Sequence, residues 1–192
     1  DNVVEGTVKG TYSLLYAYGG EHDAFGQRSL DLFGDLCCGD VAMKTQRYGW
    51  FVTDEYGQTY QRRGTFWSFY YQIIRACNKG INALNTQGVP PVVFDPDTIS
   101  DQDYINGYYY AELLTMRGWA YAALQRYFCK TVNELKDAGS DISTELSVPL
   151  YTDLDTEADT TLGAPRSTAE DVYKRVEEDL NTAIQYFEAF NE

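Results

Sequence analysis

The sequence predicts an all-α protein made of antiparallel helical hairpins, in the manner of tetratricopeptide repeats. Three observations lead to this class. Apolar residues recur at three- and four-residue spacing in five separate segments. No segment shows the apolar-polar alternation of a half-buried strand. Stretches containing glycine or proline separate the five segments. We expect one helical domain over residues 1–192, with long irregular loops at about 39–64 and 133–163.

The first two helices are predicted at about Asn2–Tyr18 and Asp23–Cys38, and Gly19 and Gly20 end the first. Each carries one apolar face. The residues expected on these faces are Val4, Val8, Tyr12 and Leu15 in the first helix, and Phe25, Leu32, Phe33 and Leu36 in the second.

The third helix is predicted from the stretch FWSFYYQIIRACNKGINAL, residues 66–84. Its apolar positions follow a three-four rhythm that is typical of one buried stripe. The members of this stripe are Trp67, Tyr70, Tyr71, Ile74, Cys77, Ile81 and Leu84. The aromatic crowding at the start of the stretch is therefore interpreted mainly as packing.

The fourth helix is predicted to begin after Ser100 and to reach about Phe128, which makes it the longest element. Ser100 is a good N-cap, and Asp101 and Asp103 complement the positive end of a helix dipole. Bulky residues form one face, and a neighbouring seam of small residues allows close approach of another helix. The seam consists of Ala111, Thr115, Gly118 and Ala122.

The last helix has the sharpest start signal, PRSTAEDVY. Pro165 precedes it, and Ser167 followed three residues later by Glu170 fits a capping box. The expected apolar face consists of Val172, Val176, Leu180, Ala183, Ile184 and Phe187. The polar, acidic segment before this helix is interpreted as an excursion over the surface.

Composition and charge exclude several classes of ligand. The formal net charge is −14, which would repel nucleic acid and anionic membrane surfaces. No apolar run approaches the length of a membrane-spanning helix. The four cysteines lack metal-ligand spacing, so they are interpreted as buried small apolar residues. We expect no cofactor and no metal.

Catalytic motifs are also missing from the sequence. His22 is the single histidine, and it lies between Glu21 and Asp23, where a solvated side chain is the usual outcome. A glycoside hydrolase needs only two carboxylates, so the 29 acidic residues do not exclude one. The acidic run from Asp153 to Asp159 lacks the glycine and final glutamate of an EF-hand loop.

The loop at about 39–64 carries the residues best suited to a binding site. Loops of this length in compact domains are commonly functional. This one contains aromatic residues with arginines on both sides. Aromatic plates with polar donors around them suit the rings of a carbohydrate. The alternative is that the arginines pair with surplus acids on neighbouring helices.

Three stretches together resemble the SusD/RagB family of nutrient-binding outer-membrane lipoproteins of Bacteroidetes. WSFYYQIIRACNKGINAL is similar to the family's W-x-x-x-Y-x-x-I-x-x-A/C-N helix. AELLTMRGWAYAALQRYFCK is similar to its A-E-A-x-x-L-R-A-x-x-Y-F-x-L helix. VPL followed by PRSTAEDVYKRVEEDLNTAI looks like its V-P-L … P-R-S-S-x-x-E-V-Y-x-x-I-x-x-D-L segment. Family members are considerably longer, so the resemblance implies the N-terminal portion of such a protein.

The resemblance implies a non-catalytic protein that captures oligosaccharide and delivers it to a TonB-dependent SusC-like transporter. It also implies anchoring in the outer membrane through an N-terminal lipid, although the lipidated cysteine is not in this sequence. The loop before the third helix is one region from which family members recruit binding aromatics. The resulting candidate ligand-binding residues are Tyr48, Trp50, Phe51, Tyr56 and Tyr60.

Two other functions remain open from the residues alone. A helical-repeat adaptor would use its tyrosines to contact a peptide or another protein. An all-helical glycoside hydrolase would use a pair of its carboxylates.

Overall fold

The computed structural model describes residues 2–16, 26–38, 61–90, 92–95, 97–155 and 163–190. Helices account for most of this part of the chain, as the sequence predicts. They are α1 (Asn2–Leu14), α2 (Gln27–Cys38), α3 (Gln61–Gln87), α4 (Asp101–Phe128), α5 (Val132–Asp137) and α7 (Ala169–Ala189). The strand-like pairing among these residues is an isolated antiparallel bridge between Leu146 and Thr168. The all-α prediction is confirmed.

The chain divides into two compact units. One consists of Tyr12–Phe69, and the other of Asp1–Thr11 together with Tyr70–Glu192. Both α1 and α3 run from one unit into the other, so each helix contributes one end to each unit.

In the smaller unit, the start of α2 depends on a glycine. Gly26 has φ of 63°, and a Cβ built on it would lie 2.2 Å from the carbonyl oxygen of Leu15. That same oxygen accepts a hydrogen bond from the Gln27 N–H at 3.0 Å. The backbone at Gly26 therefore approaches the end of α1 too closely for any side chain.

We expect Gly26→Ala to lower the stability of the smaller unit by about 2 kcal/mol or more. The added Cβ would clash with the Leu15 carbonyl, and alanine disfavours the left-handed backbone conformation found at this position. Hydrogen exchange of the α2 amides would report the loss as faster exchange. Gly6→Ala is the matched control, since a Cβ at Gly6 meets nothing within 4 Å. Equal exchange in the two variants would contradict this account of Gly26.

The predicted apolar face of α2 is correct only in part. Phe33 and Leu36 are half-buried, but Leu32 is 53% exposed and Leu30 is buried instead. Phe25, also predicted on this face, lies outside the described residues. Phe33 is half-buried and packs edge-on against Phe66 of α3, with ring centroids 5.0 Å apart. Four apolar residues spread around a short helix allow more than one face to be buried, and here contact with α3 decides between them.

In the larger unit, the first turns of α1 pack on α3 and α4. Val4, Val8 and Thr11 are buried, while Tyr12, which was expected on the same face, is 39% exposed. A Cβ at Gly80 of α3 would lie 2.6 Å from Leu113 Cδ1 of α4 and 3.1 Å from Thr7 Cγ2 of α1. Gly80 therefore lets the three helices meet closely.

The apolar stripe of α3 is largely confirmed. Tyr70, Ile74, Cys77, Ile81 and Leu84 are at most 1% exposed, and Ile73 joins them. Trp67 and Tyr71 are half-buried. The helix begins at Gln61, so the last residues of the loop predicted at 39–64 are helical.

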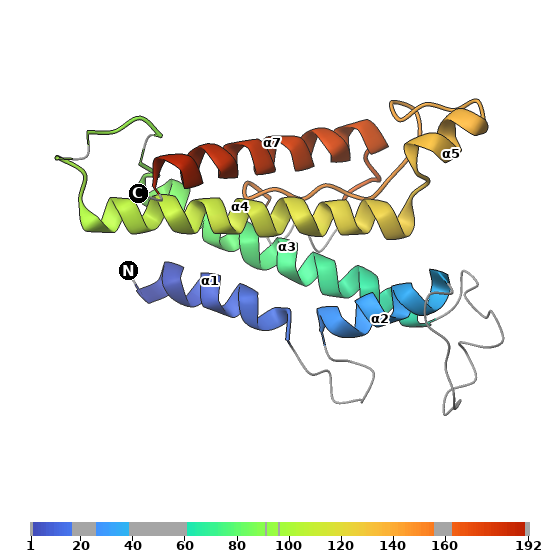
Figure 1. Cartoon of the computed structure of the whole chain (residues 1–192), viewed down its shortest axis with the longest axis horizontal. Helices are drawn as coiled ribbons and strands as arrows, with labels where there is room; N and C mark the ends of the chain where they lie inside the picture. The colour runs from blue at the N-terminus through green and yellow to red at the C-terminus, as the bar shows by residue number, and fades with distance from the viewer. Residues whose placement is uncertain are drawn as a thin grey trace. The chain divides into compact units, whose positions relative to one another are not determined.

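The longest helix, α4, is central to the larger unit and runs antiparallel to both α3 and α7 (Figure 1). The predicted cap is confirmed, because the Ser100 side chain accepts a hydrogen bond from the Asp103 N–H at 3.1 Å. Two glycines of α4 face α7. A Cβ at Gly118 would lie 3.2 Å from Leu180, and one at Gly107 would lie 2.8 Å from the ring of Phe190. The predicted small seam is therefore correct at Gly118 but not at Ala122, which is exposed.

The connection from α4 to α7 is not a simple surface excursion. It contains α5, which begins with a capping box between Thr131 and Glu134. After α5, Ser147, Val148 and Pro149 are buried. The Arg166 guanidinium donates hydrogen bonds to the carbonyl oxygens of Leu146 and Ser147. Residues 147–149 are buried and residues 150–153 are half-buried, and this stretch is called the 147–153 segment below.

The start of α7 lies one residue beyond the predicted position. Thr168 is the N-cap, and its hydroxyl accepts a hydrogen bond from the Asp171 N–H at 3.1 Å. Ser167 cannot take this role because its backbone is paired with the 147–153 segment. Its carbonyl accepts from the Ser147 N–H at 2.7 Å, and its own N–H donates to Val148 O at 3.3 Å.

Candidate functional site

The polar centre of the larger unit is a buried ion pair between α4 and α7. Arg117 Nε donates to Asp179 Oδ2 at 2.7 Å, and Nη2 donates to Asp179 Oδ1 at 2.8 Å. The two side chains are 3% and 2% exposed. This is the two-pronged geometry in which a guanidinium best matches a carboxylate.

The third nitrogen of Arg117 links this pair to α3 and to the 147–153 segment. Nη1 donates to Asn78 Oδ1 at 2.8 Å and to Asp153 Oδ1 at 3.1 Å. Asn78 Nδ2 then donates to the carbonyl oxygen of Tyr151 at 3.1 Å. Asn85 Nδ2 donates to the second oxygen of Asp153 at 3.1 Å. The side chains of Asn78, Arg117, Asp153 and Asp179 are called the Arg117 network.

Arg117 is held in its charged form. Burial alone would lower the pKa of Arg117, but the hydrogen bonds and charge of Asp179, followed by those of Asp153, outweigh burial and raise the pKa. Close by, burial raises the pKa of Cys77 to about 12, although Arg117 opposes the shift. A permanently charged guanidinium and an unreactive thiol suit a structural role for this centre.

Two tyrosines, the buried Tyr121 and the half-buried Tyr71, hold the 147–153 segment through its backbone. The Tyr121 hydroxyl donates to Tyr151 O and accepts from the Tyr151 N–H, both at 2.7 Å. The Tyr71 hydroxyl donates to Pro149 O at 2.7 Å. Burial is the largest cause that raises the pKa of both phenols, so both stay protonated and remain donors.

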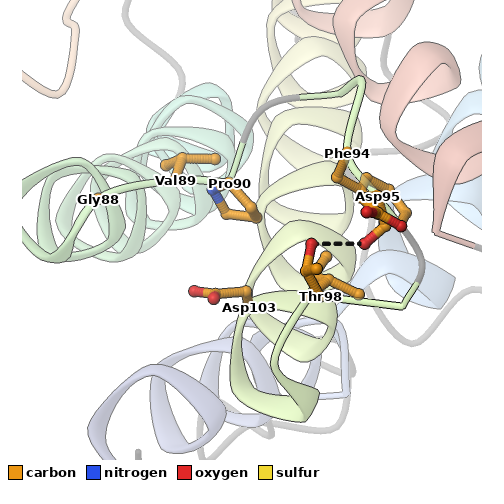
Figure 2. Close-up of a pocket in the computed structure, with 8 residues that line it drawn as sticks. Gly88, Val89, Pro90, Phe94, Asp95, Thr98 and Asp103 are labelled. Atoms are coloured by element: carbon orange, nitrogen blue, oxygen red, sulfur yellow. Dashed lines mark hydrogen bonds between the residues drawn. The ribbon is translucent and has the colours of Figure 1, made fainter.

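The structure also describes a surface cleft at the connection between α3 and α4 (Figure 2). Its volume is about 340 Å³. Its apolar wall and its polar edge come from one short stretch of chain. The lining residues are Gly88, Val89, Pro90, Phe94, Asp95, Thr98, Ile99 and Asp103.

The polar side chains of this cleft mainly offer hydrogen-bond acceptors. Thr98 uses its hydroxyl proton to bond Asp95 O at 3.2 Å, as Figure 2 shows. The Asp95 carboxylate accepts from the Asp97 N–H at 3.0 Å, and Asp103 accepts from the Ser100 hydroxyl at 2.7 Å. Both carboxylates thus stabilise local turns, and their free lone pairs suit a ligand that donates hydrogen bonds.

The predicted ligand-binding residues lie outside the part of the chain that the structure describes. These are Tyr48, Trp50, Phe51, Tyr56 and Tyr60, and His22 also lies outside it. Their assignment therefore stays a prediction.

Among the described residues, no group of three or more His, Cys, Asp or Glu side chains could hold a metal ion. In the acidic run, Asp153 belongs to the Arg117 network, and Asp155 accepts hydrogen bonds from the N–H and hydroxyl of Thr152. In the same described ranges, no helix has the length and apolar character needed to cross a membrane.

Sequence reasoning did not foresee the Arg117 network. Arg117 lies on a face of α4 that also carries Leu114 and Tyr121, and both of these residues are buried. An arginine on a buried face needs an acid, and Asp179 occupies a matching position on the buried face of α7. This combination was the available signal for the pair.

The antiparallel helices, joined through a buried polar centre, place the protein in the class of all-α helical-hairpin folds. The comparisons identify the family. A SusD-like family model, described as starch-binding associating with outer membrane, matches residues 14–190. The chain belongs to this family. The motif residues Tyr71, Asn78, Arg117 and Tyr121 are among those that hold the helices and the 147–153 segment together.

A solved structure shows the same fold. It is the crystal structure of a SusD superfamily protein from Bacteroides thetaiotaomicron VPI-5482, with a TM-score of 0.63 and 18% sequence identity. The match covers 96% of this chain and 37% of that chain. This chain therefore corresponds to little more than a third of that protein's length. No curated protein sequence matches the chain significantly.

Proposed function

We propose that this chain belongs to a non-catalytic, glycan-binding protein of the outer membrane that delivers oligosaccharide to a TonB-dependent SusC-like transporter. The observation that carries the proposal is the family match over residues 14–190, whose description is starch-binding and outer-membrane association. The chain would be the N-terminal part of the whole protein, lipid-anchored through a cysteine outside this sequence.

The ligand site is proposed on the aromatic loop that precedes α3, with Tyr48, Trp50, Phe51, Tyr56 and Tyr60 as the contacting residues. Aromatic faces would stack on the apolar faces of sugar rings, and neighbouring arginines would donate hydrogen bonds at the ring edges. The described helices would support this loop and would not contact the ligand themselves. The polar side chains of the Arg117 network are already hydrogen-bonded to one another.

We expect Trp50→Ala in the whole protein to weaken binding of a retained polysaccharide by about tenfold or more, because a stacking surface is lost. Affinity electrophoresis on a polysaccharide panel followed by calorimetry would measure this loss. Tyr16→Ala is the matched control, since Tyr16 is a 72% exposed aromatic outside the loop.

Two results would count against the proposal. Binding that survives Trp50→Ala but is lost in Asp95→Asn would move the ligand site to the α3–α4 cleft. A protein that retains no glycan, or that releases reducing sugar, would overturn the binding function itself. Recovery of a TonB-dependent transporter with the tagged protein from outer membranes would test the delivery step.

A further inference from the structure

The α3–α4 cleft has an apolar wall that is held in place by α7. Pro90 is buried, and its carbonyl oxygen accepts a hydrogen bond from the Tyr186 hydroxyl at 3.0 Å. The ring of Phe94 packs against the buried ring of Phe190, with centroids 4.6 Å apart. Because these contacts already order the wall, a ligand would not have to order it on binding.

The edge of the cleft carries two carboxylates that are only partly used by the protein. One oxygen of Asp95 accepts from the Asp97 N–H at 3.0 Å, and one oxygen of Asp103 accepts from the Ser100 hydroxyl at 2.7 Å. Within the described ranges, no donor of the protein bonds to the second oxygen of either carboxylate. Figure 2 shows both carboxylates at the edge of the cleft. Each can therefore accept a hydrogen bond from a ligand.

The chain supplies no positive side chain to this stretch. The sequence has no lysine, arginine or histidine between Lys79 and Arg117, whereas four aspartates lie within residues 95–103. None of these aspartates forms an ion pair with another described residue. The positive end of the α4 dipole is equivalent to about half a charge, and Asp101 in the first turn alone balances it. The cleft therefore keeps a negative charge that attracts a cation.

The size of the cleft and its two kinds of surface favour one long cationic side chain. Its volume of about 340 Å³ is at the lower end of the range for ligand pockets. An arginine has an apolar stem that suits the wall, and a flat guanidinium that contacts aromatic rings and donates several hydrogen bonds. A lysine ammonium is more strongly hydrated. Because the cleft is open at the surface, the backbone that carries the arginine can stay outside it.

We propose that the α3–α4 cleft binds an arginine side chain of a partner polypeptide. The stem of this arginine lies against Pro90 and Phe94, and its guanidinium donates hydrogen bonds to the second oxygens of Asp95 and Asp103. The proposal does not depend on glycan binding, because none of the residues that line the cleft belongs to the aromatic loop at about 39–64.

The first test titrates N-acetylarginine amide into the whole protein and follows the ligand by NMR. We expect a Kd of about 1 mM, and binding at least about fivefold weaker for N-acetylcitrulline amide, which has nearly the same shape but no charge. Raising the salt concentration from about 50 mM to about 500 mM should weaken the binding of the arginine probe. Equal affinities for the two probes, or no binding of either at about 10 mM, would overturn the proposal.

Matched substitutions test whether the probe binds at the cleft. Asp103 and Asp171 have the same local role, because each lies in the first turn of its helix and accepts a hydrogen bond from its N-cap hydroxyl at 2.7 Å. Asp171 does not line the cleft. Asp103→Asn and Asp95→Asn should each weaken binding of the arginine probe at least about threefold, whereas Asp171→Asn should leave it unchanged. An equal loss in all three variants would show a response to net charge alone and would overturn the proposal.

Two further probes test the chemical identity of the ligand. We expect N-acetyllysine amide to bind more weakly than the arginine probe, because its ammonium is more strongly hydrated. We also expect free arginine to bind more weakly, because its own carboxylate is repelled by the acidic edge of the cleft. Tighter binding of the lysine probe would assign the cleft to an ammonium group, and tighter binding of free arginine would assign it to a free amino acid. Either result would overturn the proposal.

Discussion

Asp179→Asn is expected to lower the free energy of unfolding by about 3 kcal/mol or more. The substitution keeps the shape of the side chain but leaves Arg117 buried without its two-pronged counter-charge. Its remaining partners, Asn78 and Asp153, each receive one hydrogen bond from a single guanidinium nitrogen. Urea unfolding at neutral pH would measure the change.

Glu178→Gln is the control for charge, because it removes a carboxylate from the same helix at a side chain that is 64% exposed. We expect it to change stability by less than about 0.5 kcal/mol. Arg117→Met in an Asp179→Leu background should be more stable than Asp179→Leu alone, since the unpaired charge is then gone. If Asp179→Asn and Glu178→Gln lose the same stability, the ion pair does not hold α4 to α7.

Phe190→Ala is expected to lower the free energy of unfolding by about 3–4 kcal/mol, the usual cost of removing a fully buried phenylalanine ring. Phe190 is 1% exposed, at the C-cap of α7. Its ring lies 4.6 Å from that of Phe94 and 5.7 Å from that of Tyr186, between centroids. Thermal unfolding followed by circular dichroism would report the loss.

A double-mutant cycle makes the prediction for Phe190 specific. Gly107→Ala should destabilise the parent protein, since the new methyl would lie 2.8 Å from the Phe190 ring. In the Phe190→Ala background the same substitution should cost less, because space has opened above Gly107. If the losses of stability from Gly107→Ala and Phe190→Ala simply add in the double variant, this packing is contradicted. Glu188→Ala, at an exposed site of α7, is the control for changes in helix propensity.

The sequence predicts a helix end or a buried face correctly where residues within a few turns determine it. Ser100 and Asp103 form the α4 cap within one turn, and the stripe of α3 follows from the period of its own sequence. These features need no knowledge of a distant partner. Membership in the family was likewise readable, because its motif residues occur in order along the chain.

The predictions of the α7 cap and of the connection before α7 are wrong because contacts with a segment distant in sequence override the local sequence pattern. Ser167 satisfies the sequence rule for a cap, but its backbone is paired with Ser147 and Val148. The 147–153 segment looked exposed because its neighbours are acidic, yet helix side chains hold its carbonyl groups. Arg117 and Asp179 are 62 positions apart, and although each lies on the buried face of its own helix, neither face shows by itself which partner it meets. The candidate binding aromatics lie outside the described residues, so their role depends on the binding experiment.

The Arg117 network also has a consequence for the order of events during synthesis. The ribosome releases α3 and α4 before Asp179, so a nascent chain can form the hairpin while Arg117 still lacks its main counter-charge. Burying an unpaired guanidinium costs several kcal/mol, and the nascent hairpin is therefore expected to keep water around Arg117. The core of the larger unit would close only once α7 has emerged, which makes completion of α7 the committing step in the folding of this unit.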